Sequence, residues 1–371
     1  MDREKTKEKK TPEEWGRTYE QKRDVYEQFT IKLKALIGEL LKKNKIEPAQ
    51  IEHRTKGVKS FIVKIQIEGR EFNDPLCEIT DLVGIRIIGY YREDVEKIGE
   101  IIEKEFDVDW ENSIDKSRLL DPEQFGYLSV HYVISLSPER IKLTQWQDFA
   151  GIRAEIQVRT VLQHAWAGID HQLRYKTEKE APRNLRRQLF RLSALLELTD
   201  LEFSNLRKRR EKIEEKYIEQ LQKGKLDIAL DLSSMNAYFE STKQHLRWMK
   251  VAEEVGFPKA DLPKELQQDI LKGVRRNLLI LLQTTGVTTI EELDNALQHE
   301  SKWGKDVLRR FLEAFLSIGD VPPVLPDIVV LYLLLFARKN SVDETILDIL
   351  GFTTVQQGAI RGVITDNPKV G

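Results

Sequence analysis

Basic and hydroxyl side chains recur at a regular spacing between His53 and Lys64, where they suit the binding of a polyphosphate. Arg54 and Lys56 lead into an expected helix, and Ser60 and Lys64 follow at intervals of four residues. This interval places Lys56, Ser60 and Lys64 along one ridge of a helix. Cations and backbone N–H groups near a helix start bind phosphate oxygens. A basic helix face that only meets solvent is the alternative that the spacing leaves open.

Two charged residues interrupt an apolar, β-branched run, residues 79–90, that is typical of a buried strand. Asp81 stands near its start, and Arg86 lies inside it after Gly84. Because a charge within a strand core is costly unless it is paired or functional, both side chains are candidates for a site. A structural Asp–Arg ion pair explains them equally well.

An aromatic ring, a hydroxyl and an imidazole alternate along the next expected strand, residues 127–136. Tyr127, Ser129 and His131 fall on one face of it, because successive side chains of a strand point to opposite faces. Together they can stack on a nucleobase and hydrogen-bond its sugar. A half-exposed polar strand face is the simpler alternative.

A further strand, expected at residues 151–160, has a polar face that suits the floor of a site. Glu155 is a candidate for binding a cation, and Gln157 and Arg159 for binding substrate. With Asp81 on a neighbouring strand, Glu155 can hold Mg²⁺ against phosphate groups. The residues of this face are Arg153, Glu155, Gln157 and Arg159.

Two histidines, His164 and His171, share one face of the helix expected at residues 161–176. A zinc site needs further ligands, and Cys77 is the only thiol in the chain. We therefore interpret these histidines as substrate-binding or hydrogen-bonding groups.

The elements that must position these residues alternate between helix and strand. The order predicts an α/β (α+β) domain in which helices flank a mixed β-sheet. A long helical pattern follows at residues 183–221, and the remaining chain is helical throughout. We expect a flexible tail at 1–14, one domain at 15–222 and an all-α region at 223–371. The other expected helices cover residues 15–43, 58–67 and 92–106.

The composition excludes several classes of protein. The chain has 371 residues, and its 59 Lys and Arg nearly balance its 61 Asp and Glu, so net charge predicts neither a nucleic-acid binder nor a membrane binder. A single cysteine excludes an intrachain disulfide and fits a reducing, cytoplasmic location. The longest apolar run, residues 328–337, is about half of what a membrane span needs, so we expect no membrane partner.

Taken in order, the four polar segments resemble the synthetase domain of RelA/SpoT-type alarmone synthetases. The resemblance covers about residues 20–215, and the segment from Gln163 to Lys176 is similar to the small synthetases in particular. It implies a nucleotidyltransferase-like sheet. The matching segments are Arg54-x-Lys56-x-x-x-Ser60-x-x-x-Lys64, Asp81-Leu-Val-Gly-Ile-Arg86, Gly126-Tyr-x-Ser-x-His131 and Glu155-Ile-Gln-Val-Arg-Thr160.

The resemblance implies an ATP-dependent enzyme that transfers the β,γ-pyrophosphate of ATP to the ribose 3′-hydroxyl of GDP or GTP. Asp81 and Glu155 would hold Mg²⁺, and Asp81 would also help to activate the hydroxyl. Tyr127 would stack on the acceptor base. The expected acceptor contacts are His131, Gln157 and His164, and the expected ATP contacts are Arg54, Lys56, Ser60, Lys64 and Arg86.

One departure from the family pattern leaves the acceptor open. Glu123 stands where many guanosine-specific members have a cation for the acceptor 5′-phosphates, although Lys116 and Arg118 can compensate. The segment also resembles the toxic branch of the family, which pyrophosphorylates the 3′-CCA end of tRNA. Such an acceptor has no 5′-diphosphate, so the absence of this cation would weaken its binding only a little. Basic segments that could contact tRNA are Lys5–Lys10, Arg186-Arg187 and Arg207–Arg210.

We interpret residues 223–371 as a helical regulatory domain. One hypothesis is a sensor or built-in antitoxin that covers the active site until a trigger protein binds. The other is an oligomerisation or stability module, and an oligomer is compatible with the sequence. A third hypothesis, a degenerate synthetase that only binds ligands, is the weakest, because Asp81, Glu155 and the phosphate-binding cations are all present.

Overall fold

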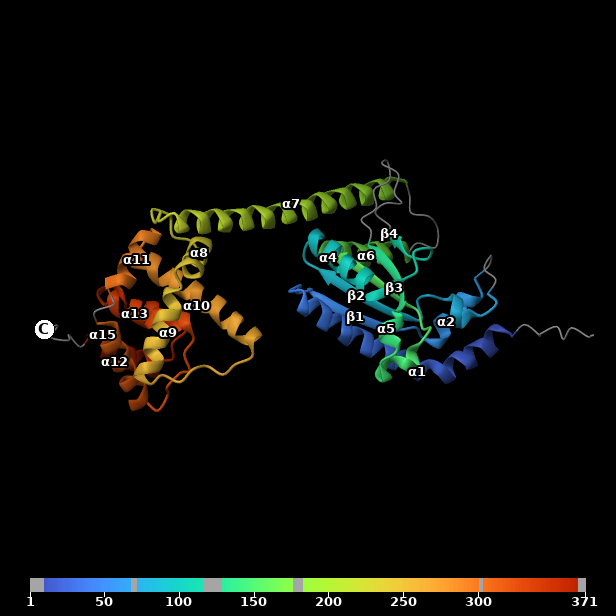
Figure 1. Cartoon of the computed structure of the whole chain (residues 1–371). Coiled ribbons are helices and arrows are strands. Elements are labelled where there is room, and N and C mark those ends of the chain that lie inside the picture. Colours follow the sequence, from blue (N-terminus) through green and yellow to red (C-terminus); the bar gives the residue numbers. More distant parts are fainter. Residues whose placement is uncertain (1–9, 68–71, 116–128, 176–182, 300–302, 366–371) are drawn as a thin grey trace, which may run out of the picture. The chain divides into compact units, whose positions relative to one another are not determined.

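The computed structural model describes residues 10–67, 72–115, 129–175, 183–299 and 303–365. The chain forms two compact units, Met1–Arg207 and Lys208–Gly371, which we call the N-terminal and C-terminal units (Figure 1). Their boundary lies within one long helix, α7 (Arg183–Gln222). The domain boundary expected at 222/223 stays a prediction.

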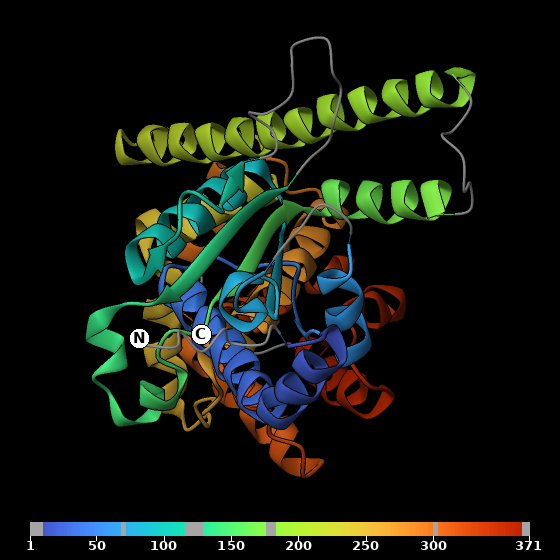
Figure 2. The same ribbon diagram turned by 90° about the vertical axis from the view of Figure 1, so that its right-hand side faces the viewer.

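The described residues of the N-terminal unit contain a six-stranded mixed sheet (Figure 2). Its order is β1-β2-β6-β5-β3, and β4 also pairs with β5. The β2 and β6 strands run parallel, and the other pairs are antiparallel. This agrees with the mixed α/β architecture expected from the sequence. The strands are β1 (Gln50–Thr55), β2 (Val83–Gly89), β3 (Phe106–Val108), β4 (Ile114–Asp115), β5 (Val130–Leu136) and β6 (Ala154–Thr160).

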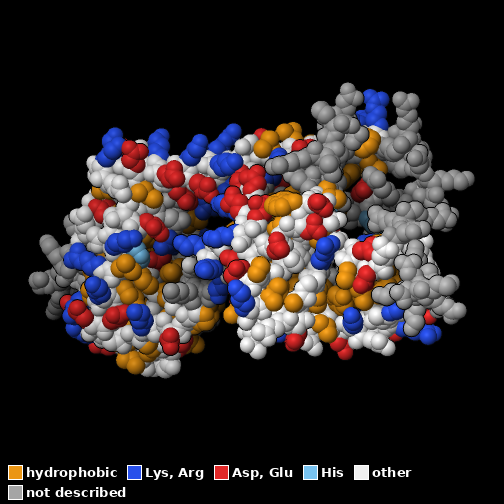
Figure 3. All heavy atoms as spheres, turned by 45° about the vertical axis from the view of Figure 1, so that its right-hand side comes forward, with side chains coloured by type: hydrophobic (Ala, Val, Ile, Leu, Met, Phe, Trp, Pro, Cys, Tyr) orange, Lys and Arg blue, Asp and Glu red, His pale blue; other side chains and the backbone are white. Residues whose placement is uncertain are grey.

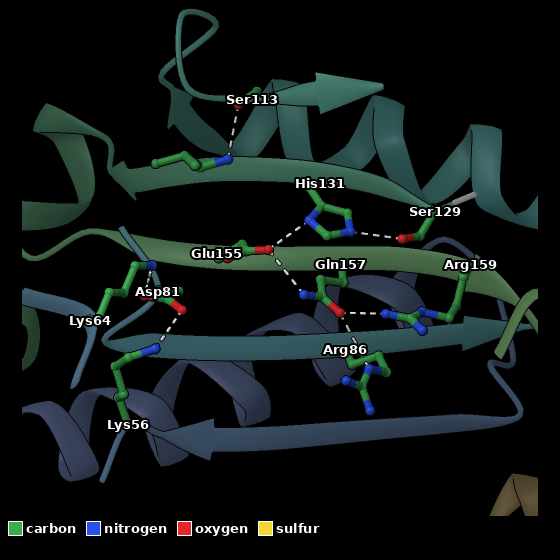
Figure 4. Close-up of polar contacts among 11 residues, drawn as sticks. Lys56, Lys64, Asp81, Arg86, Ser113, Ser129, His131, Glu155, Gln157 and Arg159 are labelled. Carbon is green, nitrogen blue, oxygen red and sulfur yellow. Dashed lines mark hydrogen bonds and ion pairs between the residues drawn. The ribbon is translucent and has the colours of Figure 1, made fainter. Parts of the chain in front are cut away.

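One face of the sheet is apolar and packs against helices, whereas the other is polar. In β6, Ala154, Ile156 and Val158 are completely buried, and the intervening Glu155 and Gln157 point to the other face. The helices α1 and α4 pack against the apolar face. The close-up view shows both helices behind the sheet and the polar side chains in front (Figure 4). The apolar core therefore fixes which side chains face the site.

The first helix begins at Pro12 rather than at Trp15, because Thr11 caps its N-terminal end. The Glu14 backbone N–H donates to Thr11 Oγ1 at 3.3 Å, and the Thr11 N–H donates to Glu14 Oε2 at 2.8 Å. This reciprocal pair satisfies two backbone donors at the helix start. The helices of this unit are α1 (Pro12–Lys43), α2 (Val58–Ile65), α3 (Pro75–Glu78), α4 (Arg92–Glu105), α5 (Pro138–Ile141) and α6 (Val161–Tyr175), with a short 3₁₀ helix at Thr144–Phe149.

The first part of α7 is held against the sheet by polar contacts. Thr160 at the end of β6 donates a hydrogen bond to Asp200 at 2.9 Å, and Asp200 is buried. Arg207 forms an ion pair with Asp94 at 2.7 Å and lies over the ring of Tyr91. These contacts connect the end of β6 and the start of α4 with α7.

The C-terminal unit consists of helices around one apolar helix, α13. Residues 329–336 are buried, and α13 packs against α9, α10 and α12. The apolar run of the sequence is therefore the core helix of its own unit. None of the described helices is long and apolar enough to span a membrane. The helices are α8 (Leu232–Thr242), α9 (Gln244–Val255), α10 (Lys264–Thr284), α11 (Ile290–His299), α12 (Gly304–Ser317), α13 (Pro326–Ala337), α14 (Glu344–Ile349) and α15 (Thr354–Thr365).

Two helix ends in this unit repeat the same local structure. Gly286 and Gly351 follow helices with φ of +80° and +82°, a left-handed conformation that favours glycine. The hydroxyl oxygens of Thr289 and Thr353 then each accept a hydrogen bond at 3.3 Å from the backbone N–H of the third residue after them. The segments Gly286-Val-Thr-Thr-Ile290 and Gly351-Phe-Thr-Thr-Val355 are therefore similar both in sequence and in local structure.

Candidate active site

The polar face of the sheet borders a hollow of about 570 Å³ in the N-terminal unit. Five residues that the sequence singles out line it: Arg54, Asp81, Arg86, Glu155 and Gln157. They come from β1, the turn before β2, β2 itself and β6. The fold therefore gathers cations and carboxylates from distant parts of the chain around one hollow.

Asp81 lies between two lysines at one end of this hollow. Lys56 Nζ donates to Asp81 Oδ2 at 2.6 Å, and Lys64 Nζ donates to Oδ1 at 2.7 Å (Figure 4). Lys64 comes from α2, whereas Lys56 lies in the turn between β1 and α2 and not on the helix ridge that the spacing predicts. Burial by itself would raise the pKa of Asp81, but the two lysine hydrogen bonds outweigh it and hold the pKa below its ordinary value.

Glu155 is held by its neighbours on β5 and β6. His131 Nδ1 lies 2.6 Å from Glu155 Oε1, and Gln157 Nε2 donates to the same oxygen at 3.0 Å. Burial acts to raise the pKa of Glu155, but these bonds, mainly the one from His131, lower it below its ordinary value. Glu155 is therefore ionised at neutral pH, next to the ionised Asp81 in the same hollow.

A row of side chains crosses four strands beside this pair of carboxylates. The register aligns Glu52 with Arg86, Arg86 with Gln157, and Gln157 with His131. Arg86 donates to Glu52 at 2.6 Å and to Gln157 at 3.4 Å, and Arg159 also donates to Gln157. Burial, and then the nearby Arg86, lower the pKa of Arg159 to about 10, so its guanidinium stays charged at neutral pH. Arg86 lines the hollow, whereas Arg159 is buried behind Gln157.

Two of the described residues expected in the site, Ser60 and His164, do not line the hollow. Ser60 is exposed on α2 and does not line the hollow. His164 lies on α6, and its buried Nδ1 has no hydrogen-bond partner among the described residues. Burial lowers the pKa of His164, so the ring is neutral at pH 7. Tyr127 lies outside the described residues, as do Glu123, Lys116 and Arg118.

Four polar residues that sequence reasoning missed also line the hollow: Lys34, Gln50, Glu52 and His53. Glu52 is the most informative, because it forms the ion pair with Arg86. The signal was present in the alternation of Glu52 and Arg54, which places both on one face of a strand. The polar residues around it give little apolar signal for a strand, so the sequence alone does not predict this face.

The carboxylates of the hollow fit a hard divalent cation when phosphate oxygens supply further ligands. Asp81 and Glu155 would be its protein ligands. Both oxygens of Asp81 accept hydrogen bonds from Lys56 and Lys64, so a metal bound there would compete with these two ammonium groups. No group of three or more candidate ligands occurs among the described His, Cys, Asp and Glu residues.

Part of the chain is similar to proteins of a known family. Residues 53–180 match the family model described as the region found in RelA and SpoT proteins. The GTP pyrophosphokinase YwaC of Bacillus subtilis is 26% identical over 163 residues, which cover 43% of this chain and 74% of YwaC. The GTP pyrophosphokinase YjbM of the same organism is 28% identical over 203 residues, which cover 52% of this chain and 89% of YjbM.

The solved structure of small alarmone synthetase 1 from Bacillus subtilis is also similar. It is 24% identical with a TM-score of 0.43, over 53% of this chain and 98% of that one. The matched residues 53–180 include all four polar segments that the sequence singles out. Residues 53–180 therefore contain the region found in RelA and SpoT proteins, and the chain is similar to two GTP pyrophosphokinases over 43% and 52% of its length.

Proposed function

We propose that the chain is a pyrophosphokinase that transfers the β,γ-pyrophosphate of ATP to the ribose 3′-hydroxyl of GDP or GTP. The observation that carries this proposal is the pair Asp81 and Glu155 beside the cations of one hollow. Two relatives named GTP pyrophosphokinases support the same reaction class.

The reaction needs positioning and charge stabilisation more than covalent help from the protein. Arg54, Lys56, Lys64 and Arg86 would neutralise the ATP phosphates. Bound Mg²⁺ would supply charge neutralisation between Asp81, Glu155 and the phosphate oxygens. The acceptor 3′-oxygen forms a bond to the β-phosphorus, the bond to the oxygen shared with the α-phosphorus breaks, and AMP leaves.

The identity of the acceptor is a separate part of the proposal. A guanosine nucleotide is favoured by the names of the two relatives. The alternative is the 3′-CCA end of tRNA, restrained by a C-terminal antitoxin or sensor. Glu123, the residue that suggests a tRNA acceptor, lies outside the described residues. On the face drawn in Figure 3, Lys and Arg side chains are mixed with Asp and Glu, so net charge alone favours no polyanion there.

The decisive experiment offers GDP, GTP and bulk tRNA in parallel to the full chain with γ-labelled ATP and Mg²⁺. We expect label on a guanosine nucleotide; label on tRNA alone would replace the acceptor assignment. Lys64→Met should lower transfer by about 100-fold, because it removes one charge from the transferring phosphates. Lys59→Met is the matched control, since Lys59 is exposed on the same helix. Equal activity of the two variants would contradict the site assignment.

A further inference from the structure

A second hollow, of about 460 Å³, lies in the C-terminal unit. We call it the C-terminal hollow; among the residues that line it are Glu292, Asn295 and Ala296 of α11, then Trp303 and Arg338. The α11 helix packs against α13, at the end of which Arg338 lies (Figure 1). Small-molecule sites in proteins occupy about 300–1,000 Å³, so this hollow has room for a ligand of nucleoside size.

Arg338 brings a charged donor into the C-terminal hollow. The residue directly follows α13, which ends at Ala337. The Nε atom of Arg338 is buried, and no hydrogen bond joins it to a described residue. A guanidinium stays charged in a protein, and a buried donor without an acceptor is destabilising. A ligand that places an acceptor next to Arg338 would remove this cost.

Glu292 brings an acceptor into the same hollow. Its Oε2 accepts hydrogen bonds from the backbone N–H of Thr288 at 2.7 Å and of Thr289 at 3.3 Å, whereas Oε1 has no hydrogen bond with a described residue. The N–H groups of Thr288 and Thr289 hold the pKa of Glu292 below its ordinary value, so its carboxylate is ionised at neutral pH. Glu292 and Arg338 thus bring opposite charges to one hollow, and no ion pair joins them.

The chemistry of these two groups favours a ligand that has both an acceptor and a donor. A carboxylate or phosphate group would be attracted by Arg338 but repelled by Glu292. A cyclic amide is uncharged and carries a carbonyl oxygen beside an N–H group. Guanine contains such an amide, and its O6 and N7 together accept from an arginine in the commonest specific contact between arginine and a base. Its N1–H and its amino group can donate to a carboxylate.

Trp303 adds an aromatic surface to the C-terminal hollow. Its side chain is half-buried, and its ring centroid lies 5.1 Å from that of the buried Phe336. This contact holds the indole in place before a ligand binds. Nucleobases stack on aromatic side chains of this kind. Asn295 is exposed on α11 and offers a further donor and acceptor at the hollow.

We propose that the C-terminal hollow binds guanine, as guanosine or one of its nucleotides, with the base stacked on Trp303 and hydrogen-bonded to Arg338 and Glu292. The site is separate from the hollow beside Asp81 in the N-terminal unit, and its ligand is bound without being changed. The proposal goes beyond pyrophosphate transfer, because it makes the C-terminal unit a sensor of guanine compounds.

The first test is isothermal titration calorimetry of the full chain with guanosine, which has no phosphate groups. We expect Arg338→Met to weaken guanosine binding by about tenfold or more, because it removes the donors to the base. Arg309→Met is the matched control and should bind like wild type, since Arg309 is exposed on α12 and does not line the hollow. Adenosine, which has no carbonyl oxygen on its base, should bind at least about tenfold more weakly than guanosine.

Three results of the titration would overturn the proposal. These are no binding of guanosine to wild type, equal affinities of wild type and Arg338→Met for guanosine, and equal affinities of wild type for adenosine and guanosine. The last result would show that stacking alone holds the base.

A second measurement locates the ligand in the wild-type chain and so does not depend on the folding of a variant. The full chain is photolabelled with 8-azidoguanosine, and the labelled peptides are mapped by mass spectrometry. We expect label in peptides that contain Trp303 or Arg338, suppressed by excess guanosine but not by excess adenosine. Label confined to residues 50–86 would overturn this proposal and leave the proposed function intact. Label at Trp303 in a chain that transfers no pyrophosphate would support this site and contradict the proposed function.

Discussion

The structure makes its sharpest quantitative prediction for Asp81→Asn. The Asp81 side chain is 16% exposed, and its partners Lys56 and Lys64 are 9% and 22% exposed. Each lysine hydrogen bond involves two charged groups, a class that contributes about 1.5–3 kcal/mol. Removing one member of a mostly buried ion pair leaves the other charges uncompensated, at a cost of about 3–5 kcal/mol. Because these groups keep some contact with water, we expect the lower end, about 3 kcal/mol of unfolding free energy.

The pH dependence of this loss has a definite sign. The pKa of Asp81 is lower in the folded chain than its ordinary value, so the unfolded chain binds the proton more readily. Stability from Asp81 is therefore fully present above the unfolded pKa, about 3.9, and is lost as the pH falls through the folded pKa. The difference between wild type and Asp81→Asn should be constant near neutral pH and should shrink below about pH 4.

The assay is urea unfolding of the full chain at several pH values, with hydrogen exchange of residues 83–89 to assign the change to the sheet. Asp107→Asn is the matched control, because Asp107 is exposed on β3 and should change stability by less than about 0.5 kcal/mol. A loss in Asp81→Asn no larger than in this control would refute the reasoning. So would a difference that does not shrink in acid.

Three further changes test the packing that supports the site and the C-terminal unit. Ile156→Ala should cost about 2–5 kcal/mol in urea unfolding, because this β6 residue is completely buried; a cost below 1 kcal/mol would contradict its place in the core. Gly286→Ala should cost about 1 kcal/mol in thermal unfolding from its positive φ alone, since the new Cβ meets no atom; no cost would mean that the turn adopts another conformation. Arg275→Met should cost about 3–5 kcal/mol, because it leaves the fully buried Asp327 without its ion-pair partner at 2.7 Å; wild-type stability in urea unfolding would show that the pair is not formed.

Much of the sheet could be predicted from the sequence because apolar and polar residues alternate clearly. In β6 the alternation around Ile156 separates a core face from a polar face, and the structure has the same two faces. By contrast, β1 was missed, because Gln50–Thr55 is polar on both sides and has little apolar signal. It forms because β2 offers an antiparallel partner, which is a tertiary effect that local sequence does not contain.

For the same reason, the contacts between individual side chains of the candidate site could not be predicted from the local sequence. The sequence placed Lys56 on a helix ridge with Lys64, but the helix starts later and the two lysines meet through Asp81. Which carboxylate pairs with which cation depends on strand register, and register is set by pairing across the sheet. The assignment of Glu52 to Arg86 therefore became available only with the fold.

A pyrophosphokinase moves the β- and γ-phosphates of ATP together. Two labels followed in parallel, one on the α-phosphate and one on the γ-phosphate of ATP, test this with GDP, Mg²⁺ and the full chain. We expect the α-label in AMP and the γ-label in a guanosine nucleotide that has gained two phosphates at its 3′ position. Release of the γ-label as inorganic phosphate, with the α-label in ADP, would contradict it.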